Sequence, residues 1–214
     1  MRRSDWLFLL LLVVTVAGVA GALYFSETET ERGRRLEATG TETGTALVGG
    51  AFNLVDQDGI AVTENDLTGR WTLIYFGYTF CPDVCPVTLT NMAAAIEALG
   101  TAGNRVVPMF MTVDPKRDTV ESLKEYSVHF HPRTRFLTGS EEEIDRATKA
   151  FRVYRAIRAE GGRAEGARAE ADNENYLVDH TSILYLMGPD GKFVTSFSHA
   201  TSVAEMTDRL RRLL

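Results

Sequence analysis

Residues 71–86 read WTLIYFGYTFCPDVCP, and this stretch decides the fold that we predict. Its first six residues, WTLIYF, form a continuous apolar run, which is typical of a central strand with both faces covered. A helix pattern follows from about residue 86 to residue 99. A strand, a loop that carries two cysteines and a helix, in this order, indicate a layered α/β fold.

Strand and helix patterns alternate on both sides of this stretch, which supports the α/β prediction. Strands are predicted at 105–113 and 135–137, and helices at 118–130, 140–151 and 203–214. We expect Asp118 to cap the first of these helices, with Glu121 completing a capping box. Residues 160–175 are small, charged and rich in Gly and Ala, and they predict an exposed loop.

Two hairpins are predicted from turn sequences between short apolar runs. The turn DQDG at 56–59 joins residues 52–55 to residues 60–63, and the turn GPDG at 188–191 joins residues 182–187 to residues 192–197. Both hairpins belong to the predicted folded domain, which extends over residues 49–214.

The N-terminal region divides into two parts before this domain. Residues 6–25 contain no charged side chain and are long enough for a helix to cross a bilayer core of about 30 Å. We therefore predict a membrane anchor at residues 1–25, although Arg2, Arg3 and the small residues at 20–22 also fit a cleaved signal peptide. Residues 26–48 are rich in Thr, Glu and Gly, and they predict a flexible acidic linker.

Charge and cysteine content restrict the function. The chain has a net charge of −6, a pI near 5.3 and no block of Lys or Arg, so nucleic-acid binding is excluded as a prediction. Its two cysteines lie four residues apart, and a cross-link stabilises a fold most when it closes a long loop. The pair therefore indicates chemistry at the thiols rather than a structural bridge.

The thiols are placed where a thiolate is stabilised. We expect Cys81 in the loop and Cys85 at the helix cap, with Pro86 in the first helical turn, where its missing N–H is tolerated. Helix N-termini stabilise anions, including thiolates. Two thiolates suit Cu(I) once an imidazole is added, whereas zinc normally takes four ligands. Inert buried thiols and a simple disulfide remain alternatives.

Several segments together resemble the Sco/SenC family. They are FGYTFCPDVCP at 76–86, DPKRDT at 114–119, VDHTSILYLMGPDGKF at 178–193 and FNLVDQDG at 52–59. The resemblance covers roughly residues 49–214. It implies a thioredoxin-like fold with an added N-terminal β-hairpin, preceded by one transmembrane helix. It also implies a copper site, for Cu(I) or Cu(II), with Cys81, Cys85 and His180 as the metal ligands; by position alone, His180 reads as a structural or surface histidine.

The same resemblance implies a function and a location. The chain is expected to be a copper chaperone that assembles the copper centre of cytochrome c oxidase subunit II, with a second periplasmic copper chaperone as a further partner. It is expected in the bacterial inner membrane as a single-pass protein whose soluble domain faces the periplasm. Two alternatives stay open: a thiol–disulfide oxidoreductase with Cys81 and Cys85 as catalytic residues, and a passive membrane-tethered interaction module.

Other polar residues receive structural interpretations. His129 and His131 lie near the end of a predicted helix and are interpreted as capping or surface residues. Asp114 and Asp118 are assigned to a turn and a cap without chemistry. Asp179 is adjacent to His180, but in an extended backbone it points to the other side, so it receives no role.

Overall fold

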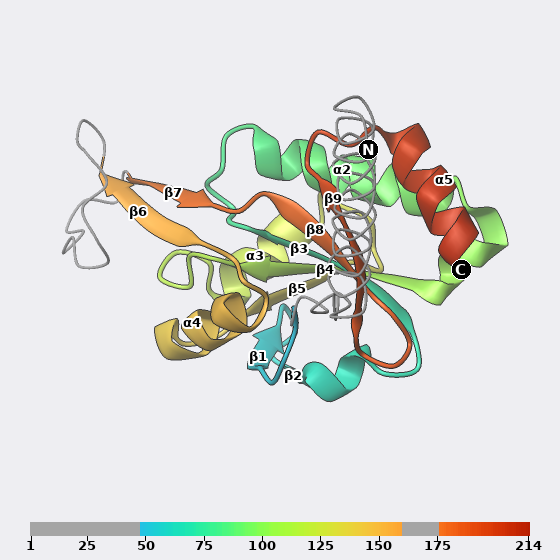
Figure 1. Cartoon of the computed structure of the whole chain (residues 1–214). Coiled ribbons are helices and arrows are strands. Elements are labelled where there is room, and N and C mark those ends of the chain that lie inside the picture. The colour runs from blue at the N-terminus through green and yellow to red at the C-terminus, as the bar shows by residue number, and fades with distance from the viewer. Residues whose placement is uncertain (1–47, 160–175) are drawn as a thin grey trace, which may run out of the picture. The chain divides into compact units, whose positions relative to one another are not determined.

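The structure is a computed structural model, and it describes residues 48–159 and 176–214 (Figure 1). Its main sheet has seven strands. In spatial order they are β2 (Ala61–Thr63), β1 (Asn53–Asp56), β5 (Arg135–Thr138), β4 (Val106–Thr112), β3 (Trp71–Gly77), β8 (Ile183–Met187) and β9 (Phe193–Ser198). A separate two-stranded sheet contains β6 (Arg155–Ala159) and β7 (Tyr176–His180).

Helices cover both faces of the main sheet. The α-helices are α2 (Val84–Glu97), α3 (Val120–Ser127), α4 (Glu141–Ala150) and α5 (Val203–Leu213), and the short 3₁₀ helices are η1 (Glu64–Leu67) and η2 (Gly100–Arg105). Figure 1 shows α2 and α5 together on one side of the sheet and α4 on the other. The alternation of strands and helices confirms the predicted α/β class.

Strand β3 is the central element that its apolar sequence predicts. It pairs in parallel with β4 and antiparallel with β8, so that Tyr75 faces Phe110 on one side and Leu184 on the other. Six of its seven residues are buried. Burial of a large apolar side chain contributes about 1.5–3 kcal/mol, so this strand anchors the core and fixes the loop that follows it.

Both predicted hairpins form. β1 pairs with β2 and β8 pairs with β9, each antiparallel. In the first turn, the Asp56 carboxylate accepts hydrogen bonds from the N–H groups of Asp58 and Ile60, each at 3.0 Å. Gly59 takes the left-handed conformation (φ 76°) that this turn requires. β1 also pairs with β5, so the N-terminal hairpin extends the edge of the main sheet.

The predicted helix over 118–130 needs a correction. Helix α3 begins at Val120, and Thr119 is its N-cap, accepting a hydrogen bond from the Ser122 N–H at 3.2 Å. Asp118 does not cap the helix, because its carboxylate is buried and faces Thr79 and Thr112 instead. By contrast, α4 lies within the helix predicted over 140–151, and Ser140 and Glu143 form a complete capping box at its start.

Strands β6 and β7 were not predicted. In β7 the side chains alternate, with Tyr176 and Val178 buried and Leu177 exposed, which is the period of a strand with one covered face. That signal was available, but the partner strands are separated by residues 160–175. The loop predicted at 160–175 lies outside the described residues.

The predicted anchor at 1–25 also lies outside them, as does the predicted linker except for Val48. Across residues 48–159 and 176–214, every helix is too short or too polar to cross a membrane.

Candidate functional site

The two thiols lie at the C-terminal end of β3. Cys81 is in the loop before α2, as predicted, and it is partly exposed, whereas Cys85 is fully buried. Cys85 is the second residue of α2 rather than its cap, since the N-cap is Asp83. The helix can begin this early because Pro86 still falls in the first turn, whose N–H groups have no partner within the helix.

Gly77 allows Cys85 to pack against the end of β3. A Cβ atom at this position would lie 2.8 Å from Cε2 of Phe110 and 2.9 Å from Sγ of Cys85. Both distances are shorter than ordinary van der Waals contact. The absence of a side chain at Gly77 therefore sets how closely the buried thiol approaches the sheet.

The two thiols differ strongly in acidity. A hydrogen bond from the Cys85 thiol, with further ones from the backbone N–H groups of Cys85 and Asp83, lowers the pKa of Cys81 to about 5 despite its partial burial. The Cys85 N–H lies 3.4 Å from Sγ of Cys81. The hydrogen bond to Cys81 and burial both raise the pKa of Cys85, although Tyr75 donates to its sulfur at 3.5 Å. At neutral pH the pair is therefore a Cys81 thiolate beside a Cys85 thiol.

His180 reaches the thiols from the end of β7. Its Nε2 lies 3.9 Å from Sγ of Cys85, although the two residues are 95 positions apart. Its Nδ1 lies 3.1 Å from the carbonyl oxygen of Val178. Because a carbonyl only accepts, Nδ1 donates to it, and Nε2 is the ring nitrogen that faces the thiols. The ring of Tyr78 contacts the imidazole edge to face, with 5.7 Å between centroids.

The structure thus brings the three predicted ligands together as two adjacent pairs: Cys81 with Cys85, and Cys85 with His180. Within the described ranges, no group of three or more His, Cys, Asp or Glu side chains is already spaced around one metal ion. The three side chains must therefore rearrange before all of them bind one ion. The donor set, two sulfurs and an imidazole nitrogen, suits a soft ion such as Cu(I).

Asp179 and His131, which received no chemical role, contact other charged side chains. Asp179 forms an ion pair with Arg158 across the β6–β7 hairpin at 2.5 Å and leaves His180 to the backbone carbonyl. His131 lies 3.9 Å from the carboxylate of Glu97, and His129 is exposed.

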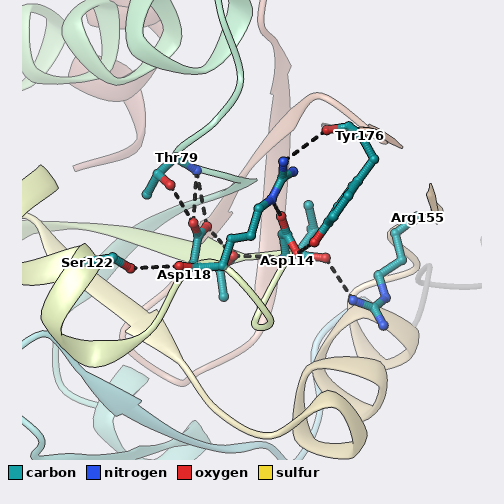
Figure 2. A network of polar contacts seen from close by, with 9 residues as sticks. Thr79, Asp114, Asp118, Ser122, Arg155 and Tyr176 are labelled. Carbon is teal, nitrogen blue, oxygen red and sulfur yellow. Dashed lines mark hydrogen bonds and ion pairs between the residues drawn. The ribbon is translucent and has the colours of Figure 1, made fainter. Parts of the chain in front are cut away.

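A polar network behind the cysteine loop was missed by the sequence analysis (Figure 2). Asp118 accepts hydrogen bonds from the hydroxyls of Thr79 at 2.5 Å and Thr112 at 2.6 Å. Burial raises the pKa of Asp118 to about 6, although these hydrogen bonds oppose the shift. The run of charged residues directly after the buried strand β4 is the sequence signal for this network. Only the packed structure shows that these side chains face the interior of the protein.

Comparisons with known proteins agree on one family. A sequence model of the SCO1/SenC family matches residues 40–214. A mitochondrial SCO1 homolog 1 from Arabidopsis thaliana is 38% identical over 95% of this chain, which spans 59% of that protein's length. The crystal structure of Arabidopsis thaliana ScoI with copper bound has a TM-score of 0.68 and 42% identity over 77% of this chain and 96% of its own.

A third similar structure is described as showing a disulfide switch in BsSco, a member of the Sco family of cytochrome c oxidase assembly proteins. It has a TM-score of 0.57 and 26% identity over 78% of this chain and 92% of its own. The fold of the described residues is therefore the thioredoxin-like Sco fold.

Proposed function

The chain belongs to the SCO1/SenC family, and from this premise we propose that it is a copper chaperone whose cargo is held by Cys81, Cys85 and His180. The observation that carries the proposal is the 3.9 Å approach of the His180 Nε2 to the Cys85 sulfur, across 95 positions of sequence. Copper in the similar Arabidopsis ScoI structure supports the choice of ion.

The acidity of the thiols supports reversible copper binding. Because the pKa of Cys81 is lowered to about 5, this sulfur is a thiolate before copper arrives. Cys85 keeps its proton and loses it when copper binds, so binding weakens as the pH falls. A site with one ready thiolate and one protonated thiol can release copper to a partner by ligand exchange.

The proposed partner is cytochrome c oxidase subunit II, and a second periplasmic copper chaperone is the proposed donor. The similar BsSco is described as belonging to the cytochrome c oxidase assembly proteins. Phe80 and Val87 lie next to the thiols in sequence and are 58% and 51% exposed. Exposed apolar side chains of this kind favour contact with a protein partner during transfer.

The proposed organisation is an anchor at residues 1–25, a linker at 26–48 and a copper-binding domain at 49–214. The proposed location is the bacterial inner membrane, with the domain in the periplasm. The uncharged run at 6–25 supports this arrangement. Protease added to intact spheroplasts should remove the domain, and complete protection would contradict the proposed orientation.

A second candidate function, thiol–disulfide oxidoreductase, is favoured by the unequal thiols. The Cys81 thiolate attacks one sulfur of a partner's disulfide, forming a mixed disulfide and releasing the other partner sulfur, which takes up a proton. Cys85 then loses its proton and attacks the Cys81 sulfur, leaving an intramolecular disulfide and a second partner thiol. Two electrons pass to the partner. Such turnover, undiminished in His180→Ala, would favour this function over copper delivery.

The test of the copper proposal is an anaerobic titration of the reduced full chain with Cu(I) against a calibrated competing chelator. We expect one tightly bound ion, loss of tight binding in Cys81→Ser and Cys85→Ser, and at least a roughly tenfold weakening in His180→Ala. His129→Ala is the matched control, because this exposed histidine lies outside the site. Unchanged affinity in all three site variants would overturn the proposal.

A further inference from the structure

Arg117 lies between the two segments that carry the proposed copper ligands. Its side chain is 11% exposed, and its Nε donates to the Asp114 carboxylate at 2.5 Å. Its Nη1 donates to the backbone carbonyl of Tyr176 at 3.0 Å. Tyr176 begins strand β7, and this strand ends in His180. The Arg117 guanidinium is therefore hydrogen-bonded to β7, the strand that carries the His180 imidazole.

The same guanidinium contacts the loop that presents the thiols. Its Cζ lies 3.6 Å from the ring centroid of Tyr176, 4.5 Å from that of Phe80 and 5.7 Å from that of Tyr78. Phe80 immediately precedes Cys81. A planar cation between aromatic faces is attracted to each of them, and the attraction strengthens when water is excluded. One side chain thus joins the cysteine loop to β7.

Asp114 and Asp118, which flank Arg117 in the sequence, strengthen this connection, and Figure 2 shows both carboxylates. Asp114 accepts a hydrogen bond from the Tyr176 hydroxyl at 2.7 Å, which fastens β7. Asp118 accepts from the Thr79 N–H at 3.1 Å and from its hydroxyl, which fastens the cysteine loop. The segment from Asp114 to Asp118 therefore holds both halves of the site.

Strand β7 needs such a connection because it does not belong to the main sheet. Its strand partner in the described chain is β6, and the pair forms a sheet of its own. An isolated two-stranded hairpin is only marginally stable in water. Beyond the short link from His180 to β8, side-chain contacts therefore help to hold His180 near the thiols, including the edge-to-face contact between His180 and Tyr78, the ring that Arg117 also approaches.

We propose that Arg117 is a positioning residue that fixes His180 against the two thiols, so that the imidazole contributes to copper binding. This inference rests on the proposed copper function. It predicts that loss of Arg117 removes the contribution of His180 and leaves that of the thiols. The effect of Arg117 should then vanish when His180 is already absent.

The test is a double-mutant cycle on the full chain with Arg117→Met, His180→Ala and the double variant, using the same Cu(I) competition assay. We expect Arg117→Met to weaken Cu(I) binding roughly tenfold, about as much as His180→Ala, and the double variant to bind no more weakly than His180→Ala. X-ray absorption of the Cu(I) form should show a nitrogen ligand in the wild type and none in Arg117→Met.

Arg209→Met is the matched control. Arg209 also stacks on an aromatic ring, with its Cζ 4.4 Å from the Phe197 centroid, and it donates to Thr195 and Ser196. This variant loses a similar set of contacts without touching β7 or the cysteine loop, so Cu(I) affinity should stay unchanged. If Arg117→Met does not fold by circular dichroism, Arg117→Lys takes its place, because lysine keeps the charge but loses the fork that reaches both Asp114 and the Tyr176 carbonyl.

The outcomes separate the two proposals. The positioning role is wrong, and the copper site stands, if His180→Ala weakens Cu(I) binding but Arg117→Met does not. The same conclusion follows if Arg117→Met weakens Cu(I) binding equally in the presence and in the absence of His180. If the chain binds no Cu(I), the copper function is wrong. Hydrogen exchange over residues 176–180 of the metal-free chain then tests whether Arg117 holds β7 in place. Exchange should be faster in Arg117→Met than in Arg209→Met, and equal rates would show that Arg117 does not hold the strand.

Discussion

Replacing Gly77 by alanine puts a methyl group into space that the core already fills. The new Cβ would lie 2.8 Å from Phe110 Cε2, 2.9 Å from Cys85 Sγ and 3.0 Å from Tyr75 Cε1. Non-bonded heavy atoms prefer about 3.5–4.0 Å, so each neighbour must move by roughly 0.5 Å or more. All three neighbours are fully buried, so each lies among other close-packed core atoms.

The expected cost follows from this crowding. Overpacking of a filled core costs about 1–3 kcal/mol of unfolding free energy. For a chain of this size, that loss lowers Tm by roughly 2–12 °C. The displacement of Cys85 also disturbs its 3.9 Å approach to His180, so Cu(I) affinity should fall in the same variant.

The assay is thermal and urea unfolding of the reduced, metal-free full chain in detergent micelles, followed by far-ultraviolet circular dichroism. Gly188→Ala is the control, because its Cβ would meet Asp190 at 3.0 Å and Val194 at 3.2 Å, two exposed side chains that can move aside. If Gly77→Ala is as stable as Gly188→Ala and binds Cu(I) like the wild type, the close packing of Cys85 against β3 does not hold the thiol in place.

Two further predictions concern pH. The pKa of Cys81 is lowered to about 5, so the rate at which iodoacetamide alkylates Cys81 should rise with a midpoint near that pH, while Cys85 stays protected. Peptide mass spectrometry measures both alkylation rates. A Cys81 midpoint near the ordinary thiol pKa of about 8.5 would contradict the hydrogen bonding described above. Burial raises the pKa of Asp118 from 3.8 to about 6, so the folded chain binds this proton more tightly than the unfolded chain. The free energy of unfolding should therefore rise as the pH falls through about 6 and lose this contribution as the pH rises again. Relative to Asp118→Asn, the wild type should gain about 2.5 kcal/mol between neutral pH and about pH 4 in urea unfolding, and a pH-independent difference would refute the assignment.

The sequence predicts secondary structure correctly where the pattern within one segment decides the structure of that segment. The apolar run at 71–76 predicts a strand, and the sequence at 140–151 predicts a helix; both are found. It was insufficient at Asp118, which has the residue type of a cap but lies one position before the cap that forms, at Thr119. The local sequence cannot show which of two neighbouring residues caps the helix, because the answer depends on what each side chain contacts in the packed structure.

The candidate site divides in the same way. The spacing of Cys81 and Cys85 between a strand and a helix indicates reactive thiols from the sequence, since both residues belong to one continuous segment. His180 was predicted as the third ligand only from the resemblance to a family, because nothing in the sequence around His180 indicates that it lies near the thiols. Strand β7, which carries this histidine, was itself not predicted.

The sequence by itself determined the α/β class, most strands and helices, the acidic charge and the place of the thiol pair, because each of these depends on neighbouring residues. Only the tertiary structure decided that His180 comes within 3.9 Å of Cys85 and that Arg117 lies among three aromatic rings. Such contacts join segments that are far apart in the chain, and they form only when the packing of the whole sheet and its helices fixes where each segment ends.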